Sequence, residues 1–129
     1  MAAEQIPKLR VLVADDMQSM RGIIKAALKS AGVVDIVDVP DGEIAIQHLK
    51  SKPTDLVVCD WDMPKVSGLE VLQWVRDNEA LKTLPFILLT ANNQAGHVKE
   101  AILAGVTDYI TKPFAVSYTH LTLPTKRIV

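Results

Sequence analysis

Three short, largely apolar runs constrain the fold of this chain more than any other feature of its sequence. They span residues 9–14, 56–59 and 86–89, and each is followed directly by polar residues. A short apolar run without alternating polar positions is typical of a strand whose two faces are both covered. Such strands occur mainly in parallel sheets, where helices connect one strand to the next. The sequence therefore predicts an α/β fold around a parallel sheet.

The segments between these runs carry the spacing of helices. After the first run, apolar residues recur along one helix face, and these residues are Met20, Ile23, Ile24, Ala27, Leu28 and Ala31. Shorter patterns of the same kind predict three further helices, over residues 42–49, 69–78 and 98–105. Weaker patterns predict a peripheral strand at residues 33–39 and a last strand at residues 109–110. Five strands that alternate with four helices predict a doubly wound sheet with right-handed crossovers and helices on both faces.

The composition fits a single domain without a disulfide. A chain of 129 residues, of which 49% are hydrophobic, can bury one core. Its single cysteine cannot form an internal disulfide, and no apolar run is long enough to span a membrane. A net charge of -1 gives no basic field that would attract nucleic acid or an anionic membrane. Because residues 1–8 lack the apolar core of a signal peptide, we expect the protein in the cytoplasm.

Residues that can carry chemistry follow the predicted strands. Each lies at or just past the carboxyl end of a strand, and the set is Asp15, Asp16, Asp60, Thr90 and Lys112. Because the carboxyl ends of parallel strands meet at one edge of the sheet, we expect these side chains to form a single site. Crowded carboxylates repel one another unless a cation joins them, and their hard oxygen atoms suit Mg²⁺. The pattern therefore predicts a magnesium site at this edge.

The residues around Asp60 form a distinct loop signal. Pro64 lacks an amide hydrogen and restricts the residue before it to extended conformations, so the chain must leave the sheet here. Cys59 points away from Asp60 by strand alternation, and we expect it to be a small core residue. Trp61 is expected beside the site as a bystander. The three histidines lack ligand spacing or a partnered nucleophile and are interpreted as surface or incidental residues: His48, His97 and His120.

With this spacing, and with the dipeptides Met63-Pro64 and Lys112-Pro113, the chain resembles the receiver domain of two-component response regulators. The similarity is strongest to the CheY type of chemotaxis regulators. It covers residues 9–115, which we expect to form the receiver domain after a lead-in of residues 1–8. The resemblance implies a flavodoxin-like sheet with strand order 2-1-3-4-5 and a role in phosphorelay signal transduction.

The resemblance also implies roles for individual residues. Mg²⁺ would be ligated by Asp16, Asp60 and the backbone carbonyl of Asp62, with Asp15 acting mainly through water. Asp60 would be the nucleophile that accepts a phosphoryl group, while Lys112 counters the charge on the transferring oxygens. Thr90 would donate its hydroxyl to the phosphoryl group, and Tyr109 would turn inward as Thr90 moves. Many chemotaxis members carry a neutral residue at the position of Asp62.

Partners follow from the same resemblance. The phosphoryl donor would be a phosphohistidine on a histidine kinase or on a phosphotransfer domain. The downstream target would be a protein, such as a flagellar motor component or a fused output domain, with no direct binding of nucleic acid or membrane. The domain would not be an enzyme that turns over substrate, although it would assist its own phosphorylation and dephosphorylation.

Three alternatives to a stand-alone chemotaxis-type receiver are considered. One is a receiver fragment of a longer transcriptional regulator. Another is a phosphatase of the haloacid dehalogenase type, since Asp60-Trp61-Asp62 matches the DxD motif of those enzymes. They place that motif on their first strand and follow it with a small residue instead of Met63-Pro64. A flavin-binding module of the same fold is disfavoured, because the first strand ends in two carboxylates where a phosphate cradle would be needed.

The last segment, residues 116–129, has a different character from the rest. It has β-branched residues, a proline and no helical apolar period. Its start resembles the translation of a transposon-based sequencing adaptor, so we expect a non-native tail. The receiver resemblance implies a fifth helix in this place, and we expect that helix to be missing or replaced.

Overall fold

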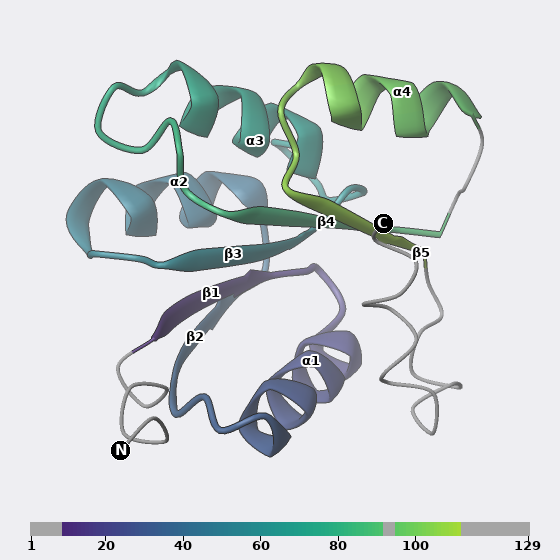
Figure 1. The fold of residues 1–129 in the computed structure, drawn as a ribbon. Coiled ribbons are helices and arrows are strands. Elements are labelled where there is room, and N and C mark those ends of the chain that lie inside the picture. Colours follow the sequence, from purple (N-terminus) through teal and green to yellow (C-terminus); the bar gives the residue numbers. More distant parts are fainter. Residues whose placement is uncertain (1–8, 92–94, 112–129) are drawn as a thin grey trace.

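The structure is a computed structural model that describes residues 9–91 and 95–111. Five strands alternate with four helices in this part of the chain (Figure 1). The strands are β1 (Arg10–Ala14), β2 (Asp35–Val39), β3 (Leu56–Asp60), β4 (Phe86–Thr90) and β5 (Asp108–Thr111). The helices are α1 (Gln18–Ser30), α2 (Gly42–Ser51), α3 (Gly68–Asp77) and α4 (Ala95–Leu103).

The strands form one parallel sheet in the order β2-β1-β3-β4-β5. This confirms the predicted fold class and strand order. The strand expected to be peripheral, β2, lies at one edge of the sheet and pairs with β1 alone among the described strands. The next pair brings β1 and β3 side by side, with Ala14 opposite Cys59. Residues that follow β1 and residues that end β3 therefore lie next to each other.

Two helices next to the site begin at side chains that cap them. Asp41 accepts a hydrogen bond from the amide of Ile44 and so satisfies one free donor at the start of α2. Ser67 and Glu70 form a reciprocal capping box at the start of α3. Both caps fix the point at which the chain turns from a loop into a helix near the carboxyl edge of the sheet.

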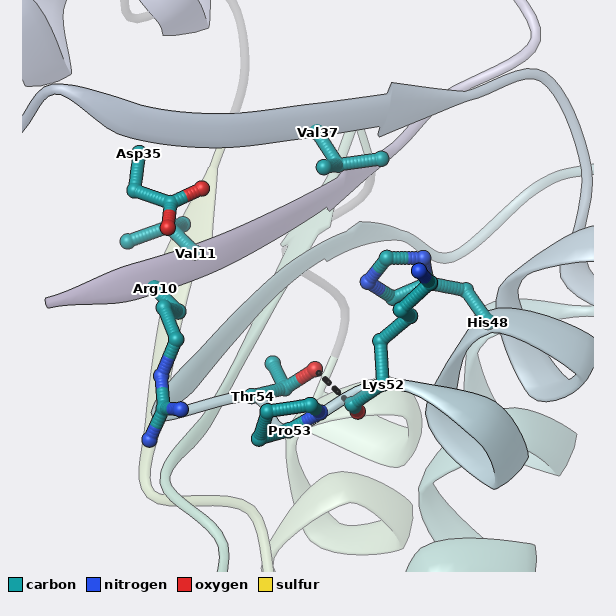
Figure 2. Close-up of a pocket in the computed structure, with 8 residues that line it drawn as sticks. All are labelled: Arg10, Val11, Asp35, Val37, His48, Lys52, Pro53 and Thr54. Carbon is teal, nitrogen blue, oxygen red and sulfur yellow. Dashed lines mark hydrogen bonds between the residues drawn. The ribbon is translucent and has the colours of Figure 1, made fainter.

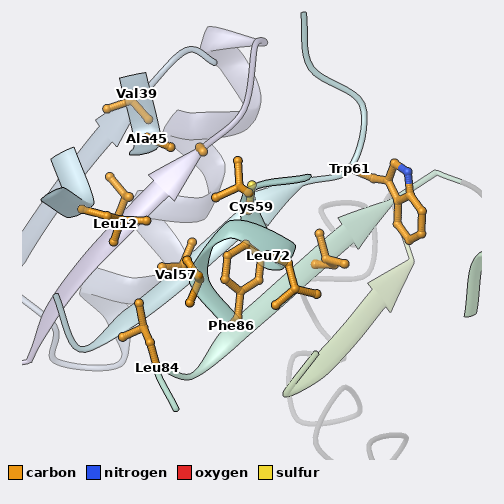
Figure 3. Close-up of a cluster of buried hydrophobic side chains, with 14 of the residues drawn as sticks. Leu12, Val39, Ala45, Val57, Cys59, Trp61, Leu72, Leu84 and Phe86 are labelled. Atoms are coloured by element: carbon orange, nitrogen blue, oxygen red, sulfur yellow. The ribbon is translucent and has the colours of Figure 1, made fainter. Parts of the chain in front are cut away.

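Helices cover both faces of the sheet, as the sequence predicted. Helices α2, α3 and α4 lie on one face and α1 on the other (Figure 1). The larger core cluster lies on the first face and includes Leu12, Val57, Leu72 and Phe86 (Figure 3). A smaller cluster packs against α1 and includes Val13, Ile24 and Leu89. Alternate residues of the buried strands contribute to the two clusters, which is why these strands are apolar on both faces.

Some predictions concern residues outside the described ranges. They are the role of Lys112, the interpretation of His120, the lead-in of residues 1–8, the fifth helix and the tail of residues 116–129. Within the described residues, no helix is both long and apolar enough to cross a membrane.

Candidate functional site

Three carboxylates gather at the carboxyl edge of the sheet. Asp15 follows β1 and Asp16 comes next, while Asp60 is the last residue of β3. One oxygen from each of the three lies within 4.8 Å of the others. The side chains of Asp15 and Asp60 are buried, and Asp16 is exposed to solvent. The structure thus brings together the three carboxylates that the sequence predicted as one group.

Several hydrogen bonds hold Asp15 in place. Its amide donates to the carbonyl of Val39 at 3.1 Å, which extends the pairing of β1 with β2 by one residue. Its Oδ1 accepts from the amide of Met17 at 2.9 Å. Its carbonyl accepts from Nη1 of Arg21 at 2.7 Å, and the same guanidinium pairs with Asp38. The chain therefore turns from β1 into α1 in a fixed geometry that presents Asp16 to solvent.

Hydrogen bonds tie the start of the loop after Asp60 to β4 and to the first residue of α3. The amide of Trp61 donates to the carbonyl of Leu89 at 2.7 Å, and the Trp61 carbonyl accepts from the amide of Gly68 at 2.8 Å. A methyl group added at Gly68 would collide with the carbonyl oxygen of Asp60. Only glycine allows α3 to start this close to the strand, so Gly68 sets the position of the Asp60 backbone.

The far side of the same loop rests on the start of α2. Nζ of Lys65 lies 3.7 Å from carboxylate oxygens of both Asp41 and Glu43. Lys65 adopts a φ of 69°, in the left-handed region that non-glycine residues rarely use. A methyl group added at Gly42 would collide with the carbonyl oxygen of Val66. The sequence signals of a turn at Asp41-Gly42 did not reveal this contact, because it joins segments that lie far apart along the chain.

Thr90 and Tyr109 lie on the two strands beyond β3. Thr90 ends β4 with a fully buried side chain and pairs with Thr111 of β5. Its neighbour Leu89 pairs with Asp60, so Thr90 follows the residue opposite the candidate acceptor. Tyr109 is half-buried on β5, and burial raises the pKa of its hydroxyl above the usual value. Lys112 comes directly after β5 and lies outside the described residues.

Asp62 and Asp16 border the same open depression. Its volume is about 400 Å³, and its lining residues are Asp16, Asp62, Met63, Pro64 and Ser67. Asp62 is exposed to solvent, unlike the buried Asp60. The depression therefore gives solvent and small ions access to the acidic group from the loop side.

The cluster formed by Asp15, Asp16 and Asp60 is suited to a divalent cation. It offers at least three hard oxygen donors within coordination reach of one point, and one of the three carboxylates is exposed. Mg²⁺ prefers such oxygen ligands and keeps several water molecules, which an open site allows. Cys59 does not compete as a ligand or nucleophile, because burial, followed by the charges of Asp60 and Asp15, raises the pKa of its thiol far above neutral.

His97 is not the incidental surface residue that the sequence suggested. Its imidazole stacks on the indole of Trp61, with ring centroids 4.5 Å apart and an angle of 8° between the planes. Trp61 in turn belongs to the larger core cluster and is only 7% exposed. The prediction for His97 was wrong because no local pattern marks a contact between a loop and a helix some distance along the chain.

A second depression lies at the opposite, amino-terminal edge of the sheet (Figure 2). Its volume is about 260 Å³, and Arg10, Asp35, Val37 and His48 are among its lining residues. Burial, together with the nearby charge of Lys52, lowers the pKa of His48. Among the described residues, the three-carboxylate group lies at the other edge, so this depression is no part of the candidate site.

Comparison with known proteins agrees with this geometry. Residues 11–122 match the family described as the response regulator receiver domain. The chain is 39% identical over 106 residues to the chemotaxis protein CheY of Pseudomonas aeruginosa, and this match covers 82% of this chain and 86% of that protein.

Solved structures show the same similarity. The chemotaxis response regulator CheY4 of Vibrio cholerae has a TM-score of 0.79 at 27% identity, covering 94% of this chain and 98% of that one. The receiver domain of the sensor histidine kinase PA1611 of Pseudomonas aeruginosa has a TM-score of 0.75 at 27% identity, covering 88% and 93%. The latter structure holds a magnesium ion in its active site cleft.

Proposed function

The chain belongs to the response regulator receiver domain family and is a CheY-type receiver of two-component signal transduction. On that premise we propose that Asp60 accepts a phosphoryl group from a phosphohistidine of a histidine kinase or phosphotransfer domain. The observation that carries this proposal is the buried end of β3, where Asp60 meets Asp15 and Asp16 within 4.8 Å. A single carboxylate at that edge would support only turn chemistry.

The transfer exchanges one bond to phosphorus for another. A carboxylate oxygen of Asp60 attacks the phosphorus, and the bond between phosphorus and the donor's imidazole nitrogen breaks. The bonding electrons stay on that nitrogen. Because the other ring nitrogen of the donor carries a proton, the ring leaves as neutral imidazole, and Asp60 becomes an acyl phosphate. Because phosphoryl transfer needs little covalent help, positioning and charge stabilisation supply most of the rate enhancement. The hydrogen bonds that tie the Trp61 backbone to Leu89 and Gly68 supply this positioning.

Mg²⁺ fits this site as the cation that the acidic group requires. Asp16, Asp60 and the carbonyl of Asp62 would hold it, with Asp15 acting through water. When bound, it supplies positive charge against the oxygens of the transferring phosphoryl group. Support comes from the three carboxylates within 4.8 Å and from the magnesium ion in the receiver of PA1611.

We assign the remaining roles to residues of the last strands. Lys112 would counter the charge of the phosphoryl group, and Thr90 would donate its hydroxyl to it. Tyr109 would follow the movement of Thr90 and change the surface near β5. The added charge of about -1.5 to -2 would then shift a population of conformations without a change of fold. The positions of Thr90 at the end of β4 and of Tyr109 on the neighbouring strand support this assignment.

Receiver domains act between histidine kinases and downstream targets, and this holds for the family as a whole. For this chain we propose a cytoplasmic domain over residues 9–115, with a protein target of the chemotaxis type. Residues 116–129 are proposed as a non-native tail, on the strength of their adaptor-like sequence. The family match continues to residue 122 and overlaps the first part of that tail.

Intact mass spectrometry after incubation with acetyl phosphate and Mg²⁺ tests the proposal. We expect one labile phosphoryl group, which Asp60→Asn abolishes. Asp35→Asn is the matched control, since it removes an exposed carboxylate at the opposite edge, and its labelling should equal the parent's. Labelling that persists in Asp60→Asn would show that another residue is the acceptor.

The same reaction mixtures separate a receiver from a phosphatase of the haloacid dehalogenase type. A receiver retains the phosphoryl group for a measurable time and does not turn over a generic ester such as p-nitrophenyl phosphate. A phosphatase would release p-nitrophenol in many turnovers per chain. Asp60 ends the third strand in sequence order, whereas those enzymes carry the nucleophile on their first strand.

A further inference from the structure

Trp61 occupies a peripheral position in the fold, and yet its side chain is buried. It follows Asp60 directly and stands beyond the carboxyl end of β3, at the margin of the larger core cluster (Figure 3). A large aromatic residue at such a margin would normally show much of its surface to solvent. Only 7% of Trp61 is exposed, so another group must cover it.

His97 of α4 lies against Trp61. The two rings are nearly parallel, at an angle of 8°, and their centroids are 4.5 Å apart. This separation is at the close end of the range for stacked aromatic pairs. The contact joins the residue after the candidate phosphoacceptor to the first turn of α4, which begins at Ala95.

The ring of His97 has no second anchor at its buried nitrogen. Nδ1 is buried and has no hydrogen-bond partner among the described residues. A buried ring nitrogen normally has a partner, and its lack of one calls for a reason. In the described part of the chain, the stack on Trp61 is therefore the specific contact through which the ring acts.

Helix α4 is held more loosely than its neighbour α3. Of residues 96–103, one is buried, Ala101, whereas α3 buries four residues. The chain just past the carboxyl end of α4 is fixed, since Nε of Arg76 donates to the carbonyl of Gly105 at 2.8 Å. Elements with few buried contacts are the ones that move in conformational switching. The His97 stack thus holds the start of a helix whose other end is anchored.

We infer that His97 is a positioning residue that couples the state of Asp60 to α4 through the indole of Trp61. The Trp61 backbone is hydrogen-bonded on both sides, to Leu89 and to Gly68, so its side chain is the part that can respond. A new charge on Asp60 changes the field and the space beside the indole, and the stacked imidazole transmits that change to the first turn of α4. This inference rests on the proposed function, and it goes beyond it by naming the contact that links site and helix.

The experiment compares His97→Ala and His97→Phe in a Trp74→Phe background, where Trp61 is the only tryptophan. Acrylamide quenching reports how well Trp61 is covered. Amide hydrogen exchange of α4, with and without Mg²⁺ and beryllofluoride as a phosphoryl mimic, reports the coupling. Fluorine NMR measures how much beryllofluoride is bound. His48→Ala is the matched control, a half-buried helix histidine that lines the depression at the opposite edge.

We expect His97→Ala to expose Trp61 to acrylamide and to reduce the exchange response of α4 by about twofold or more, with beryllofluoride binding retained. His97→Phe keeps a flat ring and should restore both readouts, while His48→Ala should match the parent. An unchanged α4 response in His97→Ala, with binding retained, would overturn the inference and leave the proposed function intact. If the parent itself binds no beryllofluoride, the proposed function fails, and the coupling fails with it.

Discussion

The three-carboxylate group at the carboxyl end of the sheet and the Arg10–Asp55 pair at its amino end arrange charge in opposite ways. At the carboxyl end, the like charges of Asp15, Asp16 and Asp60 lie within 4.8 Å of one another, and two of these side chains are buried. At the amino end, opposite charges pair. Arg10 binds Asp55 through Nε at 2.9 Å, through Nη2 at 3.2 Å and through its backbone amide at 2.8 Å.

The comparison shows how a candidate functional site can be distinguished from a structural ion pair. Gathering like charges costs free energy, so an arrangement that does so serves binding or chemistry. A surface ion pair costs little and contributes little. The presence of a depression does not by itself identify the functional site. The amino end also has a depression, of about 260 Å³, lined partly by charged residues. The chemical character of the lining residues therefore identifies the candidate site better than the presence of a depression does.

We expect the largest effect from a substitution that displaces the backbone at the carboxyl end of the sheet. Gly68→Ala forces a methyl group against the carbonyl of Asp60, so the backbone at the site must move. We expect a loss of about 3 kcal/mol in the free energy of unfolding, measured by urea denaturation. We also expect weaker Mg²⁺ binding, measured by calorimetry.

Gly22→Ala is the control for that substitution. Gly22 lies on the exposed side of α1 with open space around it, and alanine there should stabilise the helix by roughly 0.5 to 1 kcal/mol. If both variants melted at the same urea concentration, the close approach of α3 to Asp60 would have no energetic weight.

We expect a smaller effect from removing one carboxylate at the carboxyl end, which should weaken Mg²⁺ binding, whereas removing one at the amino end should not. Asp16→Asn removes one of the three clustered charges, and because Asp16 is exposed, the fold should survive. We expect the dissociation constant for Mg²⁺ to rise about tenfold or more, which corresponds to about 1.4 kcal/mol. Trp61 fluorescence in the Trp74→Phe background measures it. Asp35→Asn, at the amino end, should leave the titration unchanged, and an equal effect there would mean that binding is nonspecific.

The smallest effect concerns the ion pair at the amino end. Hydrogen bonds from the Arg10 side chain and backbone lower the pKa of Asp55 below its usual value. A carboxyl group with a lowered folded pKa stabilises the protein above its unfolded pKa, and that contribution is lost as the pH falls through the folded pKa. Asp55→Asn should therefore lower the urea midpoint slightly at neutral pH.

The pH series supplies the control for the ion pair. Because the asparagine side chain of the variant does not titrate, the difference between parent and variant should shrink as the pH falls below about 4, where the parent carboxyl group becomes protonated. A difference that stayed constant down to strongly acidic pH would show that the hydrogen bonds, and not the charge, carry the contribution.

Much of this architecture could be predicted from the sequence, because its signals are local. The buried runs predicted β3 and β4 directly, and β1 begins at Arg10 with only one residue of difference from the prediction. The acidic group could also be expected, since residues at the carboxyl ends of parallel strands meet at one edge. The strand order came from the resemblance to receiver domains, and the register confirms it.

What the sequence could not predict depends on contacts between distant segments. The stack of His97 on Trp61 joins a helix to a loop that is not its neighbour in sequence, and neither residue carries a pattern that marks the other. The contact of the Asp60 loop with the start of α2, through Lys65 and Gly42, is of the same kind. Periodicity reports the environment of each element by itself, but the pairing of side chains between elements depends on the packing of the whole fold.

The order of the strands along the chain also divides the candidate site into a part that is synthesised early and a part that is synthesised late. Asp60 is the last residue of β3, and Asp15 and Asp16 directly follow β1. These two strands pair directly. Thr90 and Tyr109 belong to β4 and β5, which add to the sheet later in the chain. Because the ribosome releases the chain from its amino terminus, all three carboxylates are synthesised before either of the last strands. The part of the site that we propose to bind a cation is thus synthesised before the part that we propose to respond to phosphorylation.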